Sequence, residues 1–368
     1  ARWLSPESGN TMYASSSRTT NAWMRQFEVL DWTVIVRYIL SFLCIVLAYN
    51  AISGELESGA LRLALANSVP RAHYLLGKFF GHLVTLMVAT VVGSLLSLLI
   101  LVINQALQVD AALARGYLLF LLGGVCYVSL FLLLGLGVSV VARTSATSLV
   151  FLITAWTLLV VVLPQTSYLI ARHATERIEN DEDRVYERQY REALEREGIG
   201  IRPHELAGAD NYTMERRYAE RMAEMGAQKD RFRRDVERRQ LRQYGLARQV
   251  NVLSPGFAFQ YAVEAFLSTG ILRYESFSKQ AWEYRTTLRD FLRARDATDA
   301  DSPQIPFLRD FMSQRPIDAS DIPRFKEKAV PFRQGLAAGI LPFSILLIET
   351  IAALFFALTA FNRADLTG

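Results

Sequence analysis

Residues 52–81 of the chain read ISGELESGALRLALANSVPRAHYLLGKFFG. This stretch is polar and rich in residues that favour helix, and it lies between two long apolar runs, residues 32–52 and 79–103. Pro70 interrupts the helical pattern, because proline lacks the backbone N–H that a helix interior uses. A short amphipathic helix between two membrane spans is predicted to lie at the membrane surface, where a second protein can contact it.

The composition predicts an integral membrane protein with one large soluble insertion. Of the 368 residues, 51% are hydrophobic and 21% are charged, and the two populations are separated along the chain. Charges are rare in residues 31–171 and dense in residues 172–333. About 20 consecutive apolar residues span a bilayer as a helix. Five runs are that long, so we expect an all-α integral membrane protein with five visible spans: 32–52, 79–103, 117–141, 147–171 and 336–361.

The charges of the short loops predict the orientation of the chain. Basic residues occur in the loop 53–78, at Arg143 and at Arg363, and Lys and Arg in short loops favour the cytoplasmic side. The insertion 172–333 is then outside the cytoplasm, and the protein is expected to be a multi-pass protein of the cell inner (cytoplasmic) membrane. The start of the chain would also lie outside, without a signal peptide, so a sixth span is expected upstream of it.

This organisation predicts four regions: an outer loop (1–30), four spans with their loops (31–171), a helical insertion (172–333), and the last span with a cytoplasmic tail (334–368). Within the insertion, residues 172–197 and 211–246 are expected to form a charged helical hairpin. Ser254 can cap a helix with Pro255 at its first position. That apolar helix, 256–268, would lie at the outer membrane surface or close the core of the insertion. A further amphipathic helix, 277–295, and a loop, 296–328, follow.

The chain contains no motif for catalysis or for nucleotide binding. Gly77-Lys78 lacks the upstream glycine and the following Ser or Thr of a phosphate-binding loop. The four histidines have no metal-ligand spacing, and a net charge of +4 indicates no nucleic-acid partner. We therefore expect no enzyme activity and no cofactor on this chain. An active transporter built on it would need ATP and Mg²⁺ on a separate ATPase.

The segment GELESGALRLALANSVPRAHYLLGK, residues 54–78, carries a recognisable pattern of acids, glycines and leucines followed by Pro-Arg and Leu-Leu-Gly-Lys. It resembles the permease subunits of type-2 (type V fold) ABC exporters, in the subgroup with a large extracytoplasmic insertion before the last span. The resemblance implies that this loop forms the coupling helix that sits in a groove of the ATPase subunit. It also implies a second, shorter contact at residues 142–147.

The resemblance implies one set of residues that couple to the ATPase: Glu55, Glu57, Ser58, Gly59, Leu61, Arg62, Pro70, Arg71, Lys78 and Arg143. From the residues alone, an ordinary loop with a surface helix is the alternative. Its leucines, Leu61, Leu63 and Leu65, would then cover the helix's membrane face. Its acids would cap the helix N-terminus, where the helix dipole favours negative charge. The two roles are compatible.

Two charged residues inside the spans are candidates for a substrate path or a gate. Glu349 lies near the middle of the last span, where a charge costs about 2.5–3.5 kcal/mol. A structural hydrogen bond or a protonated carboxyl is the alternative. Arg37 lies about one turn from the start of the first span and can extend its charge to the interface. It could pair with Glu349 only if their depths match, and its place near the outer end argues against that.

The sequence therefore predicts the transmembrane permease subunit of an ATP-driven ABC transporter that exports or extracts an amphiphilic substrate. Its expected partners are an ABC ATPase, a second permease subunit of the same or a related kind, and membrane lipid. The alternative is a membrane subunit that passes ATPase movements to an extracytoplasmic partner protein and moves no substrate. The substrate, the direction of transport and the choice of homodimer or heterodimer are not encoded in any pattern found.

Overall fold

The computed structural model describes residues 31–66, 70–105, 109–142, 144–166, 241–304 and 312–364, with the isolated residues 188, 192, 230, 231, 234, 235 and 237–239. The predicted outer loop, nearly all of the helix 172–197 and most of the helix 211–246 fall outside these residues. So does Arg143.

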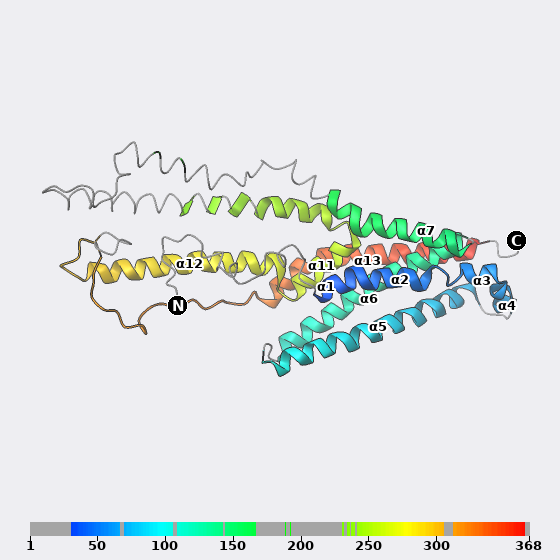
Figure 1. Cartoon of the computed structure of the whole chain (residues 1–368), viewed down its shortest axis with the longest axis horizontal. Coiled ribbons are helices and arrows are strands. Elements are labelled where there is room, and N and C mark those ends of the chain that lie inside the picture. The colour runs from blue at the N-terminus through cyan, green and yellow to red at the C-terminus, as the bar shows by residue number, and fades with distance from the viewer. Residues whose placement is uncertain are drawn as a thin grey trace. The chain divides into compact units, whose positions relative to one another are not determined.

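Five helices in the described part are long and apolar enough to cross a membrane (Figure 1). The first span, Trp32–Glu57, consists of α1 (Trp32–Val34), the π-helix η3 (Ile35–Leu40), α2 (Ser41–Ala48) and α3 (Ser53–Glu57). The others are α5 (Arg71–Ile103), α6 (Ala111–Val141), α7 (Ser145–Trp156) with the π-helix η4 (Thr157–Val162), and α13 (Phe332–Arg363). No strand occurs in the described residues. The prediction of an all-α integral membrane protein is confirmed.

The span boundaries follow from capping chemistry. Asp31 and Asp110 each accept a hydrogen bond from the backbone N–H three residues later, at 2.8 and 2.7 Å, and Thr144 does the same for α7. Such side chains satisfy donors that have no partner inside the helix. Pro70 and Pro331 directly precede α5 and α13. The second span therefore starts at Arg71, eight residues before the apolar run begins.

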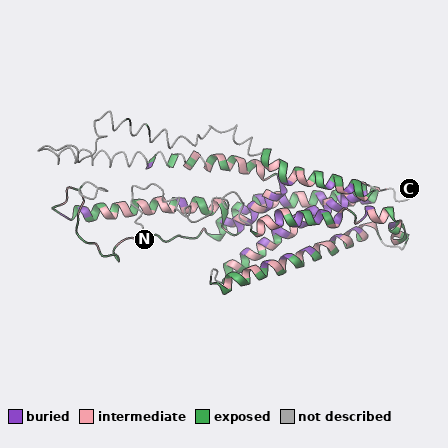
Figure 2. Cartoon of the chain, viewed as in Figure 1, coloured by how far each residue is buried: buried purple, intermediate pink, exposed green. Residues whose placement is uncertain are grey.

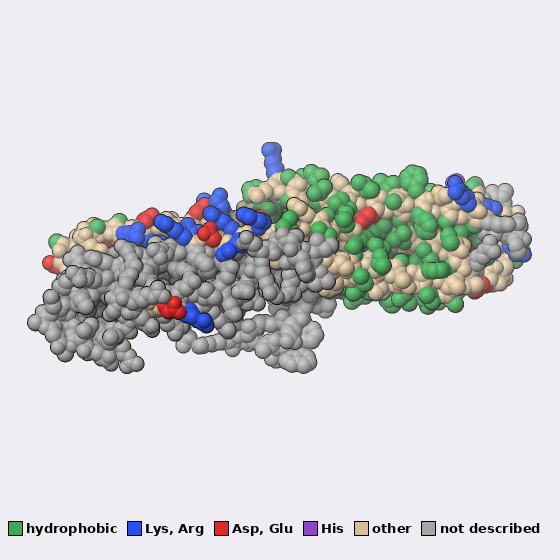
Figure 3. Space-filling model, turned by 90° about the horizontal axis from the view of Figure 1, so that it is seen from above, with side chains coloured by type: hydrophobic (Ala, Val, Ile, Leu, Met, Phe, Trp, Pro, Cys, Tyr) green, Lys and Arg blue, Asp and Glu red, His purple; other side chains and the backbone are tan. Residues whose placement is uncertain are grey.

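Helix α6 forms the centre of the bundle. Its fully buried side chains include Tyr127, Leu132 and Leu136, and it contacts α13, α2, α5 and α11. Figure 2 shows the buried residues gathered in the middle of the bundle, whereas α5 exposes much of its surface. Val84, Val88 and Val92 of α5 are spaced by four residues and are all exposed, which gives one apolar stripe along the helix. Hydrophobic side chains also cover much of the bundle face seen in Figure 3, as a helix bundle in lipid requires.

A matched pair of glycines on α6 tests this packing. A Cβ on Gly135 would lie 2.4 Å from the Cβ of Ala48 on α2, whereas a Cβ on Gly124 would meet no atom within 4 Å. We expect Gly135→Ala to destabilise the protein by about 1–3 kcal/mol, because the helices must separate. Gly124→Ala should be neutral or stabilise it by up to about 1 kcal/mol, because alanine favours helix. Thermal unfolding in detergent measures both, and equal effects would contradict the close approach of α6 and α2.

The contacts divide the chain into two compact units. Residues 27–170, 247–274 and 329–368 form one, which we call the membrane unit; residues 1–26, 171–246 and 275–328 form the other, which we call the insertion unit. Helix α11 (Pro255–Phe266) therefore belongs with the spans, although the sequence placed it in the insertion. Nine of its twelve residues are buried, and it packs on α13 and α6. A helix that is apolar on nearly all sides is a core helix rather than a surface helix.

The described part of the insertion unit is held by buried ion pairs. Helix α12 (Gly270–Ala297) covers the predicted helix 277–295 and extends beyond both of its ends. Asp230, which is buried, pairs with Arg285 at 2.8 Å and with Arg289 at 2.6 Å. Glu237 accepts hydrogen bonds from Ser278 and from the indole of Trp282. These contacts fix Asp230 and Glu237 against α12.

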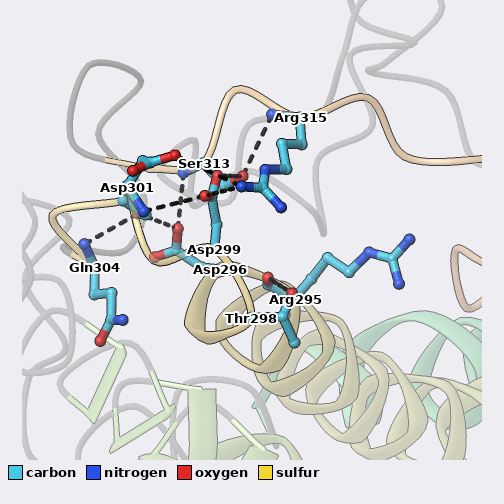
Figure 4. A network of polar contacts seen from close by, with 9 residues as sticks. Arg295, Asp296, Thr298, Asp299, Asp301, Gln304, Ser313 and Arg315 are labelled. Carbon is cyan, nitrogen blue, oxygen red and sulfur yellow. Dashed lines mark hydrogen bonds and ion pairs between the residues drawn. The ribbon is translucent and has the colours of Figure 1, made fainter.

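The end of α12 is tied to the returning loop by two buried aspartates (Figure 4). Asp296 accepts hydrogen bonds from the Ser302 hydroxyl at 2.5 Å and from the Ser313 backbone N–H at 2.7 Å. Asp299 accepts one from the Ser313 hydroxyl and pairs with Arg315 at 2.9 Å. Carboxylate contacts thus tie the described start of the loop that the sequence predicted after residue 296 to Ser313 and Arg315 further along it.

This network predicts a pH dependence. The hydrogen bond from Ser313 holds the pKa of Asp299 below its ordinary value, and the charge of Arg315 acts in the same direction. A carboxyl with a lowered folded-state pKa stabilises the fold above its unfolded pKa, about 3.9. That contribution is lost as the pH falls through the folded-state pKa. The backbone N–H of Asp301 donates to Asp299 at 3.2 Å, so we expect its amide exchange, corrected for intrinsic rates, to increase as the pH falls below about 4.

The variant Ser313→Ala should move this loss of protection to higher pH, toward the unfolded pKa. Thr286→Ala, which removes an exposed hydroxyl on α12, is the control and should leave the pH profile unchanged. Protection at Asp301 that is constant down to pH values of about 2 would contradict the role of the Asp299 carboxylate.

Candidate functional site

The segment between the first two spans, which we call the elbow (residues 49–78), contains two short helices instead of the single one predicted. Helix α3 ends at Glu57, and α4 (Ala60–Ala66) follows after a turn. Gly59 has a φ of +76°, a left-handed conformation that glycine adopts without steric cost. No atom lies within 4 Å of a Cβ at that position. The backbone conformation, rather than lack of space, therefore calls for glycine there.

Glu55 joins α3 to the start of α5. Its carboxylate pairs with the Lys78 ammonium at 2.6 Å and accepts a hydrogen bond from the Tyr74 hydroxyl. Lys78 also donates to the carbonyl of Ala51 at 2.8 Å. Two of the predicted coupling residues, Glu55 and Lys78, thus bind each other within the chain. Because the pair is partly buried, it is screened less by salt than an exposed pair.

Glu57 joins α3 to the start of α7. Its carboxylate accepts hydrogen bonds from the Ser145 backbone N–H at 2.9 Å and from the Ser145 hydroxyl at 3.0 Å. An acid at a helix N-terminus is favoured by the helix dipole. The capping role expected of this acid is therefore present, but it acts on α7 rather than on its own helix. Ser145 lies in the loop for which the sequence predicted a second partner contact.

A buried serine that the sequence reasoning missed fixes the end of the first span. The Ser139 hydroxyl oxygen accepts hydrogen bonds from the backbone N–H groups of Ile52 and Ser53, at 3.2 and 3.0 Å. It donates to the carbonyl of Tyr49 at 2.9 Å. In the sequence, Ser139 is only one small residue in an apolar run, so nothing there marked it as a partner of the elbow.

Arg71 binds the end of the last span. Its Nη1 donates to the carbonyl oxygens of Phe361, Asn362 and Ala364, at 3.4, 3.2 and 3.1 Å. The final carbonyls of a helix lack partners inside the helix and carry its partial negative charge. A guanidinium at this position donates hydrogen bonds to the unpaired carbonyls and also neutralises their partial negative charge. The structure therefore gives this predicted coupling residue a partner inside the chain.

Within the described residues of the elbow, one side of α4 is exposed. Leu61 is fully buried and fixes α4 to the core, whereas Leu63 is 75% exposed and Arg62 is also exposed. Ser58 is exposed at the preceding turn, and Pro70 is exposed at the start of α5. Leu63 was absent from the predicted coupling set, because the sequence pattern does not tell which leucine faces the core.

A second polar cluster lies at the opposite end of the membrane unit, around Arg37 in η3. This side chain is only 2% exposed. It donates to the Tyr38 hydroxyl at 2.6 Å and to the side-chain oxygen of Gln260 on α11, and its guanidinium lies 4.6 Å from the ring centre of Phe257. A π-helical segment is often associated with a functional site. Here it carries the arginine that binds α11.

Gln260 connects this arginine to a carboxyl group. Its amide donates to Glu264 at 2.7 Å, one turn further along α11. Burial raises the pKa of Glu264 above its ordinary value, and the hydrogen bond from Gln260 opposes that rise. Neither residue was singled out in the sequence, because α11 was read there as part of the insertion.

The two candidates for a substrate path or a gate lie on different helices, Arg37 on η3 and Glu349 on α13. The Arg37 side chain contacts Tyr38 of η3 and Gln260 and Phe257 of α11. Glu349 is half-buried on α13, and its Oε2 is buried without a hydrogen-bond partner in the described part of the chain. Its neighbour Thr350 donates to the carbonyl of Cys126 on α6 at 3.1 Å. Among the described residues, no three His, Cys, Asp or Glu side chains form a group that could hold a metal.

Comparison with known proteins adds three findings. The family described as "ABC-2 family transporter protein" matches residues 7–366. Two curated relatives are each named "Probable ABC transporter permease protein NosY": one from Pseudomonas aeruginosa, 37% identical over 91 residues, and one from Stutzerimonas stutzeri, 39% identical over 59 residues. These matches cover 24% and 16% of this chain and 32% and 21% of the relatives. No solved structure matches.

Proposed function

The chain belongs to the ABC-2 family of transporter proteins, and from this membership we propose that it is the membrane-spanning permease subunit of an ATP-driven transporter. We propose that a partner ATPase supplies the energy, since residues 1–368 contain no phosphate-binding loop. Energy from ATP then enters at the elbow. It moves the spans only to the extent that the ATPase binds their two states with different affinity.

The main support for this proposal is the exposed side of α4, because contacts within the chain hold the rest of the elbow in place. Leu63 and Arg62 project from a helix whose other side is fixed by the fully buried Leu61. The elbow is tied to α5 through Glu55 and to α7 through Glu57. A surface that is ordered before binding loses less conformational entropy when a partner docks. An apolar groove on the ATPase with a nearby acid would accept this surface.

The proposed task is export, or extraction from the membrane, of an amphiphilic substrate. The transporter would hold two permease subunits, identical or related, in the cytoplasmic membrane, with the insertion outside the cytoplasm. A second candidate is mechanical signalling to an external protein. It is favoured by the insertion unit, which has its own buried ion pairs between Asp230, Arg285 and Arg289 and can present a stable surface to a partner.

Reconstitution with the ATPase decides between the two candidates. Purified complex in liposomes should hydrolyse ATP, and an amphiphilic substrate should both stimulate that hydrolysis and cross or leave the bilayer. Stimulation of hydrolysis by a bound external protein, with no substrate movement, would instead support signalling. Hydrolysis that is the same with and without the permease would contradict both, because the elbow would then not be coupled to the ATPase.

A further inference from the structure

The start of α5 and the end of α13 are joined by more than one contact. Besides the three hydrogen bonds from Arg71 to the last carbonyls of α13, the ring of Tyr74 stacks on the fully buried ring of Phe361 at 6.2 Å. The hydroxyl of the same tyrosine binds Glu55 of α3. The elbow, the start of α5 and the end of α13 therefore form one connected group.

The other end of α13 is in close contact with α11. A Cβ on Gly335 would lie 2.5 Å from the carbonyl oxygen of Ala265, so the two backbones touch there. One turn later, the ring of Phe266 lies against Gly339 and packs edge-to-face with Phe343 at 5.9 Å. Closely packed helices have a few discrete arrangements and do not deform continuously. A shift of α13 at this end must therefore displace α11.

We propose that α13 carries the movement of the elbow to α11, and that Arg71 is the positioning residue that makes this transfer possible. The inference rests on the proposed function, since it needs an ATPase that moves the elbow. In this role Arg71 acts through its hydrogen bonds to the backbone of α13. Only residues 267–269 separate α11 from α12, and α12 continues into residues assigned to the insertion unit. A movement of α11 would then pass along the chain into α12.

A competing route runs through α6. Leu346, Ala353 and Ala357 are buried on α13, and α13 contacts α6 extensively. Movement passed from the elbow to α6 through Ser139 would reach α11 without Arg71. Contact alone does not establish a coupling route, so the two routes must be separated by breaking one of them.

Distances between spin labels at the two ends of the membrane unit distinguish the route through α13 from the route through α6. In the complete complex, with Cys44 and Cys126 replaced by alanine, one pair of labels is placed at His73 and Val141, at the elbow end. A second pair is placed at Val162 and Leu267, at the α11 end. All four positions are exposed. We expect ATP with vanadate to change the distance distributions of both pairs in the otherwise unaltered complex.

In Arg71→Gln we expect the nucleotide-dependent change at the elbow pair to persist and the change at the α11 pair to be lost. Arg71→Lys, which keeps a donor for the carbonyls, should restore it. Arg363→Gln removes an exposed arginine from the same end of α13 and should leave both changes intact. If Arg71→Gln does not fold, Gly335→Ala gives the same test from the other end, with Gly81→Ala, which has open space around it, as its control.

Three outcomes are informative. Loss of only the α11 response in Arg71→Gln or Gly335→Ala supports the inference. Persistence of both responses in both variants overturns it and leaves the proposed function intact, with α6 as the route. Absence of any response to nucleotide at either pair in the unaltered complex overturns the proposed function, and the inference with it.

Discussion

Leu63→Asp is expected to weaken association of the membrane subunit with its ATPase by about 30-fold or more. Leu63 is 75% exposed on the outer side of α4, and truncation of a central interface residue typically costs about 2 kcal/mol or more. An aspartate would also bring an unpaired charge into an apolar groove, which adds a desolvation penalty. A loss of about 2 kcal/mol corresponds to about a 30-fold weaker complex. Co-purification and a titration of ATPase stimulation both measure it.

Val109→Asp is the matched control for this substitution. Val109 is 73% exposed, so it resembles Leu63 in type and exposure, but it precedes α6 at the other end of the membrane unit. The control should bind the ATPase with unchanged affinity. Equal binding by both variants, or weaker binding by the Val109 variant alone, would show that α4 is not the docking surface.

Arg37→Met is expected to destabilise the membrane unit strongly, and more than Gly135→Ala does. It leaves the half-buried Gln260 and the Tyr38 hydroxyl without their charged donor, and each hydrogen bond to a charged group contributes about 1.5–3 kcal/mol. It also removes the guanidinium between the rings of Tyr38 and Phe257. We expect a loss of about 2–4 kcal/mol, measured as thermal unfolding in detergent.

Arg115→Met is the control for that measurement. Arg115 is exposed, and its guanidinium lies 4.9 Å from the Phe332 ring centre. An exposed cation–π contact contributes about 0.5–1 kcal/mol, so this variant should be nearly as stable as the unaltered protein. The double variant Arg37→Met with Gln260→Leu should recover part of the lost stability, because it leaves fewer buried polar groups unpaired. An Arg37→Met variant as stable as the control would contradict the role of Arg37 in holding α11.

The sequence predicted the spans well because a membrane helix can be recognised from its length and its hydropathy. It misassigned α11 to the insertion because a helix of twelve residues, Pro255–Phe266, is too short to be read as a span. Its apolar surface showed that it is buried but did not show against which partner. The partner became visible only in three dimensions, as close contacts with α13 and α6.

The elbow shows the same limit at the level of single side chains. Its acids, Arg71 and Lys78 were predicted to couple to an ATPase, and the structure shows what each of them binds inside the chain. Spacing alone cannot tell a charge that faces a partner from one that fixes the surface facing that partner. The exposed Leu63 and the buried Leu61 differ by only two positions. The turn at Gly59 sets the direction of α4, and this direction determines which of the two leucines is exposed.

The most direct test of the central claim is a photo-crosslink from α4 to the ATPase. A photoreactive amino acid is placed at Leu63 in the complete complex, and in a second sample at Val109. We predict a crosslinked product containing the ATPase from the Leu63 position and none from the Val109 position. An ATPase adduct from Val109, or none from Leu63 in a complex that still hydrolyses ATP in response to the permease, would contradict the assignment of the elbow as the site where energy enters.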